Sequence, residues 1–169
     1  GSSSDMREVV LSWQSKLKPT LHDFTFSELG FALEIKTTTS PIRAHKLSDL
    51  NQFDAIKDLS CVYFGSLMIE ANLKGESIKD IYSKILVKLE QEDLATEFKS
   101  RLDASYGSFK SLSQKKYSSS IKAFKIFDSL KIPKPIVSGH ISDVNWTSNL
   151  EHLKGIQIDW LLEQIKNSG

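Results

Sequence analysis

Two carboxylates and one lysine, Asp23, Glu34 and Lys36, lie in the stretch HDFTFSELGFALEIKTTTS, which covers residues 22–40. Apolar and polar residues alternate on both sides of Leu29-Gly30, and this alternation predicts two strands joined by a turn. In such a hairpin, Asp23 and Glu34 come from neighbouring strands, and their carboxylates can lie on the same face. Two carboxylates held this close repel each other, which costs stability unless a cation neutralises them.

A divalent cation is the neutralising group that this pattern favours. Mg²⁺ prefers hard oxygen ligands, is held by one or two carboxylates, and keeps water or phosphate oxygens in its other positions. Asp23 and Glu34 could therefore hold Mg²⁺ or Mn²⁺, with the carbonyl oxygen of Ile35 as a further ligand. Lys36 follows Glu34 by two residues and so points to the same face of the strand. There it could orient an attacking water, help it lose a proton, or stabilise charge on a phosphate, as in metal-assisted phosphodiester hydrolysis.

A plainer interpretation of the same residues stays open at this point. Glu34 and Lys36 could form an exposed ion pair on an edge strand, which contributes about 0–1 kcal/mol, and Asp23 could simply begin a strand. The context favours the metal site, because Asp23 stands on the preceding strand of a hairpin that follows a helix. A further helix and a buried strand come after it.

The elements around this hairpin predict an α/β fold. Periodic apolar residues and capping signals indicate a helix, two strands, a short extended piece, a helix and a buried strand, followed by two helices, two strands and a closing helix. Ser77 and Asp80 form the pattern of a capping box. The expected ranges, in chain order, are residues 6–17, 21–28, 31–39, 42–46, 47–59, 61–71, 77–90, 92–106, 117–127, 135–146 and 158–166.

Composition predicts a single domain in a reducing compartment. The chain has 169 residues, of which 40% are hydrophobic and 25% charged, a balance typical of one globular domain. Its apolar runs are shorter than a membrane span requires, and it opens with no signal segment, so we expect a cytoplasmic protein without membrane contact. The single cysteine, Cys61, has no disulfide partner and is expected to pack in the core. Residues 1–5 are typical of a tag or flexible leader.

Net charge gives no global signal of nucleic-acid binding, because it is only +1. Basic residues nevertheless outnumber acids between Lys110 and Lys134. This stretch, together with Arg43 and Lys46, could contact phosphate groups without reading sequence.

The segments HDF, ALEIKTT and KLSDLNQFD resemble the PD-(D/E)XK nuclease superfamily, and within it the PD-(D/E)XK proteins encoded beside bacterial restriction and anti-phage genes. The resemblance covers a core from about residue 7 to residue 71 and, more weakly, residues 121–146. It implies a restriction-endonuclease-like core at about 6–72, with an appended mixed α/β extension over 73–169. It also implies that Asp23 and Glu34 are metal ligands and that Lys36 is the catalytic lysine.

The resemblance suggests two further site residues and shows one departure. Some relatives carry a glutamine on the following helix, and Gln52 stands there, although Ile56 occupies the position of a tyrosine in that arrangement. Glu8, on the first helix, could supply an extra carboxylate to the metal. His22 precedes Asp23 where the motif has proline, and strand periodicity places it on the opposite face, so we interpret it as structural.

Two functions follow as hypotheses. The first is a Mg²⁺-dependent DNA endonuclease in prokaryotic defence or restriction, which could act as a homodimer or with other subunits of a defence system. The second is a catalytically inactive subunit of the same fold that binds nucleic acid or serves as a scaffold. A purely structural interaction module would be favoured if Asp23 and Glu34 lay far apart.

Overall fold

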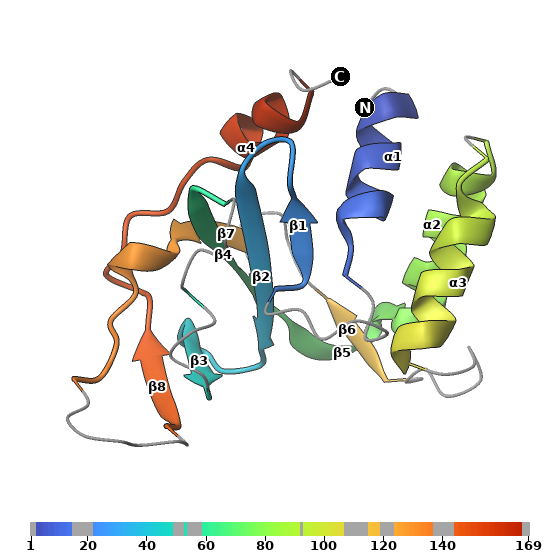
Figure 1. Ribbon diagram of the computed structural model, residues 1–169. Coiled ribbons are helices and arrows are strands. Elements are labelled where there is room, and N and C mark those ends of the chain that lie inside the picture. Colours follow the sequence, from blue (N-terminus) through green and yellow to red (C-terminus); the bar gives the residue numbers. More distant parts are fainter. Residues whose placement is uncertain are drawn as a thin grey trace.

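A four-stranded mixed sheet forms the centre of the computed structural model (Figure 1). The structure describes residues 3–14, 22–48, 53, 59–91, 93–106, 115–118, 124–136 and 144–166. The sheet has the order β1-β2-β4-β7. Its strands are β1 (Phe24–Phe26), β2 (Phe31–Thr38), β4 (Cys61–Met68) and β7 (Phe124–Asp128).

The register of this sheet determines which side chains share a face. β1 pairs with β2 antiparallel through a turn at Gly30, whose φ of 69° suits glycine. β2 and β4 run parallel, with Glu34 beside Phe64 and Lys36 beside Ser66. β7 pairs antiparallel with β4. Because directly paired residues point to the same side of a sheet, Glu34, Lys36, Phe64 and Ser66 lie on one face.

Each face of the sheet is covered by its own apolar core. On the face away from Glu34, four sheet residues pack against Leu161 and Ile165 of α4 (Ile158–Lys166). On the Glu34 face, Phe64 and Phe127 pack with residues of the connecting segments. The first core contains Phe26, Phe31, Leu33, Ile126, Leu161 and Ile165, and the second contains Leu47, Phe53, Phe64, Phe127, Ile132 and Leu150.

Three helices extend the molecule beyond β1. Figure 1 shows α1 (Ser3–Ser12) between β1 and the antiparallel pair of α2 (Ile78–Glu90) and α3 (Ala95–Tyr106). Val10 of α1 packs with Leu89, Leu94 and Ala95 in a third apolar cluster. Trp13 bridges to Phe24, and the backbone N–H of Gln14 donates to the carbonyl of Asp23 at 2.8 Å. These two contacts fix the end of α1 against the strand that begins after Asp23.

Two small two-stranded sheets complete the fold. β3 (Ala44–Leu47) pairs with β8 (Trp146–Asn149), and β5 (Glu70–Ser77) pairs with β6 (Lys116–Ser118). A 3₁₀ turn, η4 (Ser129–Lys131), follows β7. Figure 1 shows the β3-β8 pair and the β5-β6 pair on opposite sides of the lower part of the sheet.

The structure confirms the predicted α/β class, the hairpin around Gly30 and the closing helix. The predicted capping box is present, since the Ser77 hydroxyl accepts from the Asp80 N–H and the Asp80 carboxylate accepts from the Ser77 N–H. Helix α1, however, begins at Ser3 and ends at Ser12, so it includes part of the expected leader and stops earlier than predicted. The predicted helix over 47–59 falls mainly outside the described residues.

Three strand predictions differ from the structure. The strand expected over 117–127 falls on both β6 and β7, which belong to different sheets, and the strand expected over 135–146 shares only Trp146 with β8. The single strand expected over 61–71 is divided at Ile69, because β4 pairs within the main sheet whereas β5 leaves it to pair with β6. Part of the expected C-terminal extension contributes to the main sheet. β7 pairs with β4 as the fourth strand of the main sheet, and α4 covers the core on one of its faces. The division at Ile69 and the addition of β7 to the main sheet both depend on pairing between segments that are distant in sequence.

Candidate metal and catalytic site

Asp23 and Glu34 come together where β1 begins beside β2. Phe24 pairs with Leu33, so Asp23, one residue earlier, lies across from Glu34 and on the same face. A carboxylate oxygen of Asp23 accepts a hydrogen bond from the backbone N–H of Ile35 at 2.8 Å. The side chain of Asp23 thereby continues the hydrogen bonding of the ladder past the end of β1. This bond fixes its position relative to Glu34.

Glu34 is a buried carboxylate whose local partner is Lys36. Only 5% of Glu34 is exposed, and the Lys36 ammonium lies 2.5 Å from its Oε1. Burial raises the pKa of Glu34 above its ordinary value, the hydrogen bond from Lys36 opposes this rise, and the nearby charge of Asp23 adds to it. The lysine is 37% exposed, so its amine links the buried carboxylate to solvent. The exposed surface ion pair considered above does not describe this geometry, because one of its partners is buried.

Ile35 presents backbone groups to the same side of β2. Its N–H points toward Asp23, and in an extended strand the carbonyl of a residue faces the same neighbouring strand as its N–H. The carbonyl oxygen of Ile35 is therefore directed to the side of β2 on which Asp23 lies. This orientation agrees with the ligand role predicted for it, which stays a prediction.

One predicted site residue, Glu8, is not brought to this pair. Glu8 lies on α1 and is half-buried. No group of three His, Cys, Asp or Glu side chains suited to a metal occurs in the part of the chain that the structure describes, so Glu8 does not complete the pair here. Gln52 lies outside the described residues. The roles of Glu8 and Gln52 remain predictions.

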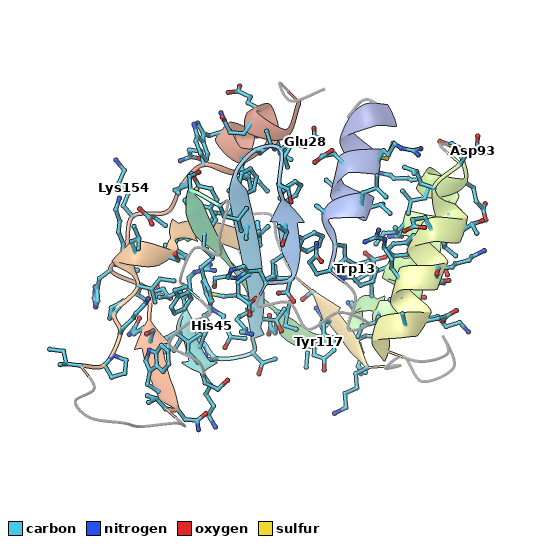
Figure 2. The ribbon with its side chains drawn as sticks, viewed as in Figure 1. Trp13, Glu28, His45, Asp93, Tyr117 and Lys154 are labelled. Carbon is cyan, nitrogen blue, oxygen red and sulfur yellow. The ribbon has the colours of Figure 1, made fainter. Side chains whose placement is uncertain are left out.

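A buried polar cluster adjoins Lys36 through its strand neighbour Ser66. Arg43, predicted as a phosphate contact, is only 3% exposed and donates from Nη1 to both the carbonyl oxygen and the hydroxyl of Ser66, at 2.8 Å each. His45 Nε2 lies 2.7 Å from the same hydroxyl. Figure 2 shows His45 between β2 and β3. Arg43 and His45 thus anchor β3 to the sheet beside the candidate site, whereas Lys46, which follows His45, is exposed.

His45 gives the fold a specific pH dependence. Burial, together with the positive charges of Arg43 and Lys36, lowers its pKa from 6.5 to about 4. A histidine with a depressed pKa binds its proton less readily in the folded state, so the folded state loses stability as pH falls from about 6.5 to about 4. We expect this loss to be on the order of 2–3 kcal/mol.

Urea unfolding of the wild type and of His45→Gln at several pH values would measure that loss. Glu34 titrates with the opposite sign, since its raised pKa adds stability as pH falls, and it does so in both proteins. The difference between the two proteins should therefore shrink or reverse toward pH 4. If the free energies of unfolding of the two proteins changed with pH in parallel, protonation of His45 would not destabilise the folded state.

Sequence reasoning did not identify the cluster of Arg43, His45 and Ser66. One signal was available, because Arg43 and His45 are separated by one residue and therefore share a face in any extended segment. The sequence does not show that Ser66 is their shared partner. The local pattern around Ser66 predicts a buried strand but does not indicate which segments contact it. His22 is buried at 3% exposure, as its structural interpretation predicted, and Cys61 packs against the first core.

A separate apolar pocket lies away from these residues. It has a volume of about 700 Å³ between the helices and β1, and Trp13, Phe24 and Leu162 are among its lining residues. Phe24 points to the face opposite Asp23 by strand alternation, so the pocket does not include the carboxylate pair.

Among the described helices, none has both the length and the apolar character needed to cross a membrane.

Comparison with known protein families agrees with the resemblance to the PD-(D/E)XK superfamily. A family model described as "Putative PD-(D/E)XK family member, (DUF4420)" matches residues 2–151. No curated protein and no solved structure matches the chain. The family match covers the central sheet, Asp23, Glu34, Lys36 and most of the segments around them. The chain therefore belongs to this PD-(D/E)XK family.

Proposed function

We propose that the protein is a metal-dependent DNA endonuclease that hydrolyses phosphodiester bonds at Asp23, Glu34 and Lys36. The observation that carries this proposal is the geometry of the three side chains on one face of the β1-β2 hairpin. Asp23 is fixed by the Ile35 N–H, and Glu34 is held by the Lys36 ammonium at 2.5 Å. Family membership supports the nuclease class, because PD-(D/E)XK proteins are generally nucleases.

The donor set fits a hard divalent cation such as Mg²⁺ or Mn²⁺. Two carboxylates on one face, with a carbonyl oxygen directed to the same side, are the oxygen ligands that such ions prefer. The raised pKa of Glu34 reflects burial and the adjacent Asp23 charge, and a cation would relieve both costs. When bound, the ion would neutralise charge that develops on the phosphate and make a coordinated water more acidic.

The residues of the chain supply the remaining catalytic roles. Asp23 and Glu34 would hold the cation, and the Ile35 N–H keeps Asp23 in place. Lys36 would orient the attacking water and stabilise negative charge on the phosphate in the transition state. One P–O bond forms to the water oxygen and one P–O bond to the leaving oxygen breaks, with that oxygen taking up a proton. A partly exposed lysine on a buried carboxylate suits this role because its amine can reach substrate.

A role in prokaryotic defence or restriction is part of the same proposal. It rests on the resemblance of HDF, ALEIKTT and KLSDLNQFD to PD-(D/E)XK proteins encoded beside restriction and anti-phage genes. DNA would be the substrate, and a second copy or other defence subunits would be partners. Exposed cations such as Lys46 would contact the backbone.

Cleavage of supercoiled plasmid with Mg²⁺, Mn²⁺ or EDTA tests the proposal. We expect nicking that requires the metal and that falls by about 10²–10⁴-fold in Glu34→Gln and in Asp23→Asn, because each loses one carboxylate charge. Both variants keep the shape of the original side chain, so a melting temperature close to that of the wild type is the control for folding. Metal-independent nicking, or nicking that both variants retain, would contradict the proposal.

A further inference from the structure

The ribbon formed by β5 and β6 carries an unusual exposed apolar residue. Leu73 is 92% exposed, and its neighbours in β5 are Asn72 and Lys74. Tyr117 of β6 pairs with both Ala71 and Glu76, so residues 72–75 form a bulge that leaves the ladder. Leu73 therefore lies at a projection from the ribbon.

The backbone of this projection is held by specific contacts. The Asn72 side chain accepts from the Lys74 N–H at 2.9 Å and donates to the Ser118 hydroxyl at 3.3 Å. Gly75 passes directly over β6, because a Cβ there would lie 2.1 Å from the Tyr117 carbonyl oxygen. Only glycine permits this approach. Leu73 is thus presented to solvent by a defined local structure.

The ribbon begins close to the candidate site. The Ile69 N–H donates to the Thr38 carbonyl at 2.9 Å, which joins the start of β5 to the end of β2. Thr38 follows Lys36 by two residues. Six extended steps of about 3.3 Å and one inter-strand crossing of about 5 Å place Leu73 no more than about 25 Å from Lys36 along this path. That upper limit corresponds to about seven base pairs of a duplex.

The surroundings of Leu73 fit nucleic acid better than a protein surface. A protein interface needs a contiguous apolar patch, whereas the residues beside Leu73 in the bulge are polar or glycine. Single apolar side chains that partly unstack a base step are a recurrent device of DNA-binding proteins. Lys74 and Lys116 add positive charge. Of the nearby carboxylates, Glu76 is ion-paired with Lys84 and Asp80 accepts from Ser77, whereas Glu70 is exposed at the start of β5.

We propose that Leu73 is a wedge that enters a base step of duplex DNA a few base pairs from the phosphate at Lys36, with the β5-β6 ribbon lying along a groove. This inference rests on the proposed function for the identity of its ligand. It adds a second contact region, and it predicts local distortion of the bound duplex.

Fluorescence of 2-aminopurine, placed singly at successive positions of a short duplex, tests the wedge in EDTA, where metal-dependent cleavage cannot proceed. With the wild type we expect increased fluorescence at one step, since 2-aminopurine brightens when unstacked. Leu73→Ala should lose this increase and bind about tenfold more weakly, whereas Leu73→Met should retain both, because methionine can also act as a wedge.

Leu130→Ala is the matched control, because Leu130 is 79% exposed and is also followed by a lysine, yet it lies in η4 on the other side of the sheet (Figure 1). It should behave as the wild type. Binding without a fluorescence increase at any position, absence of duplex binding, or unchanged binding by Leu73→Ala would overturn the wedge. The last result would instead favour a protein partner for Leu73.

The results can distinguish failure of the wedge from failure of the nuclease proposal. If Leu73-dependent unstacking occurs but no metal-dependent cleavage does, the wedge stands and the nuclease proposal fails. If cleavage occurs with no effect of Leu73, the nuclease proposal stands and the wedge fails.

Discussion

Lys36→Met is expected to slow DNA cleavage by about 10²–10⁴-fold while binding of Mn²⁺ is retained or becomes tighter. The two effects have different causes. Cleavage slows because the amine that would orient the water and stabilise the phosphate is gone. Metal binding does not weaken, because the ammonium at 2.5 Å from Glu34 Oε1 occupies a carboxylate oxygen that the cation would use.

Single-turnover cleavage of a short duplex and titration calorimetry with Mn²⁺ would measure these two effects on the same protein samples. Lys99→Met, which removes an exposed lysine from α3, is the control for loss of one positive charge. A Lys36→Met protein that cleaves at the rate of the wild type would exclude the lysine from the reaction. Loss of Mn²⁺ binding would show that Lys36 supports the metal site rather than competing with the cation.

Phe64→Ala is expected to have the largest effect on stability. Phe64 is fully buried at the centre of the sheet and makes edge-to-face contacts with Phe53 and His45, at centroid distances of 5.6 Å and 5.4 Å. Truncating a buried phenylalanine removes its transfer free energy and leaves a cavity, so the free energy of unfolding should fall by about 3–5 kcal/mol. Phe64 is also the strand neighbour of Glu34, so activity should decline with stability.

Urea unfolding would test this prediction against Leu130→Ala, which truncates an exposed side chain and should change stability by less than about 0.5 kcal/mol. An equal, small effect of the two substitutions would mean that the core around Phe64 does not determine the stability of the sheet.

Patterns over a few neighbouring residues were sufficient to predict the hairpin and the start of α2. Alternation on either side of Gly30 predicted the β1-β2 hairpin with Asp23 and Glu34 on one face, and the register of the hairpin agrees with this arrangement. Ser77 and Asp80 predicted the start of α2 because both partners of the capping box lie within four residues. The candidate site was predictable for the same reason, since its three side chains lie within one hairpin.

Long-range pairing explains most of what could not be predicted. Nothing in the residues of β7 specifies that it pairs with β4, and this choice decides that Ile126 and Phe127 enter two different cores. The division of β4 and β5 at Ile69 likewise depends on β6, which is distant in sequence. The contact of Arg43 with Ser66 joins residues 23 positions apart, and burial made an expected surface cation part of the interior.

Binding of Mn²⁺ to the wild type and to Asp23→Asn, measured by titration calorimetry, tests most directly whether Asp23 and Glu34 form a metal site, because it requires no knowledge of the substrate. We predict that the wild type binds Mn²⁺ and that Asp23→Asn, which keeps the side-chain shape but lacks one charge, binds it much more weakly. Equal binding by both proteins, or no binding by a folded wild type, would contradict a metal site at Asp23 and Glu34.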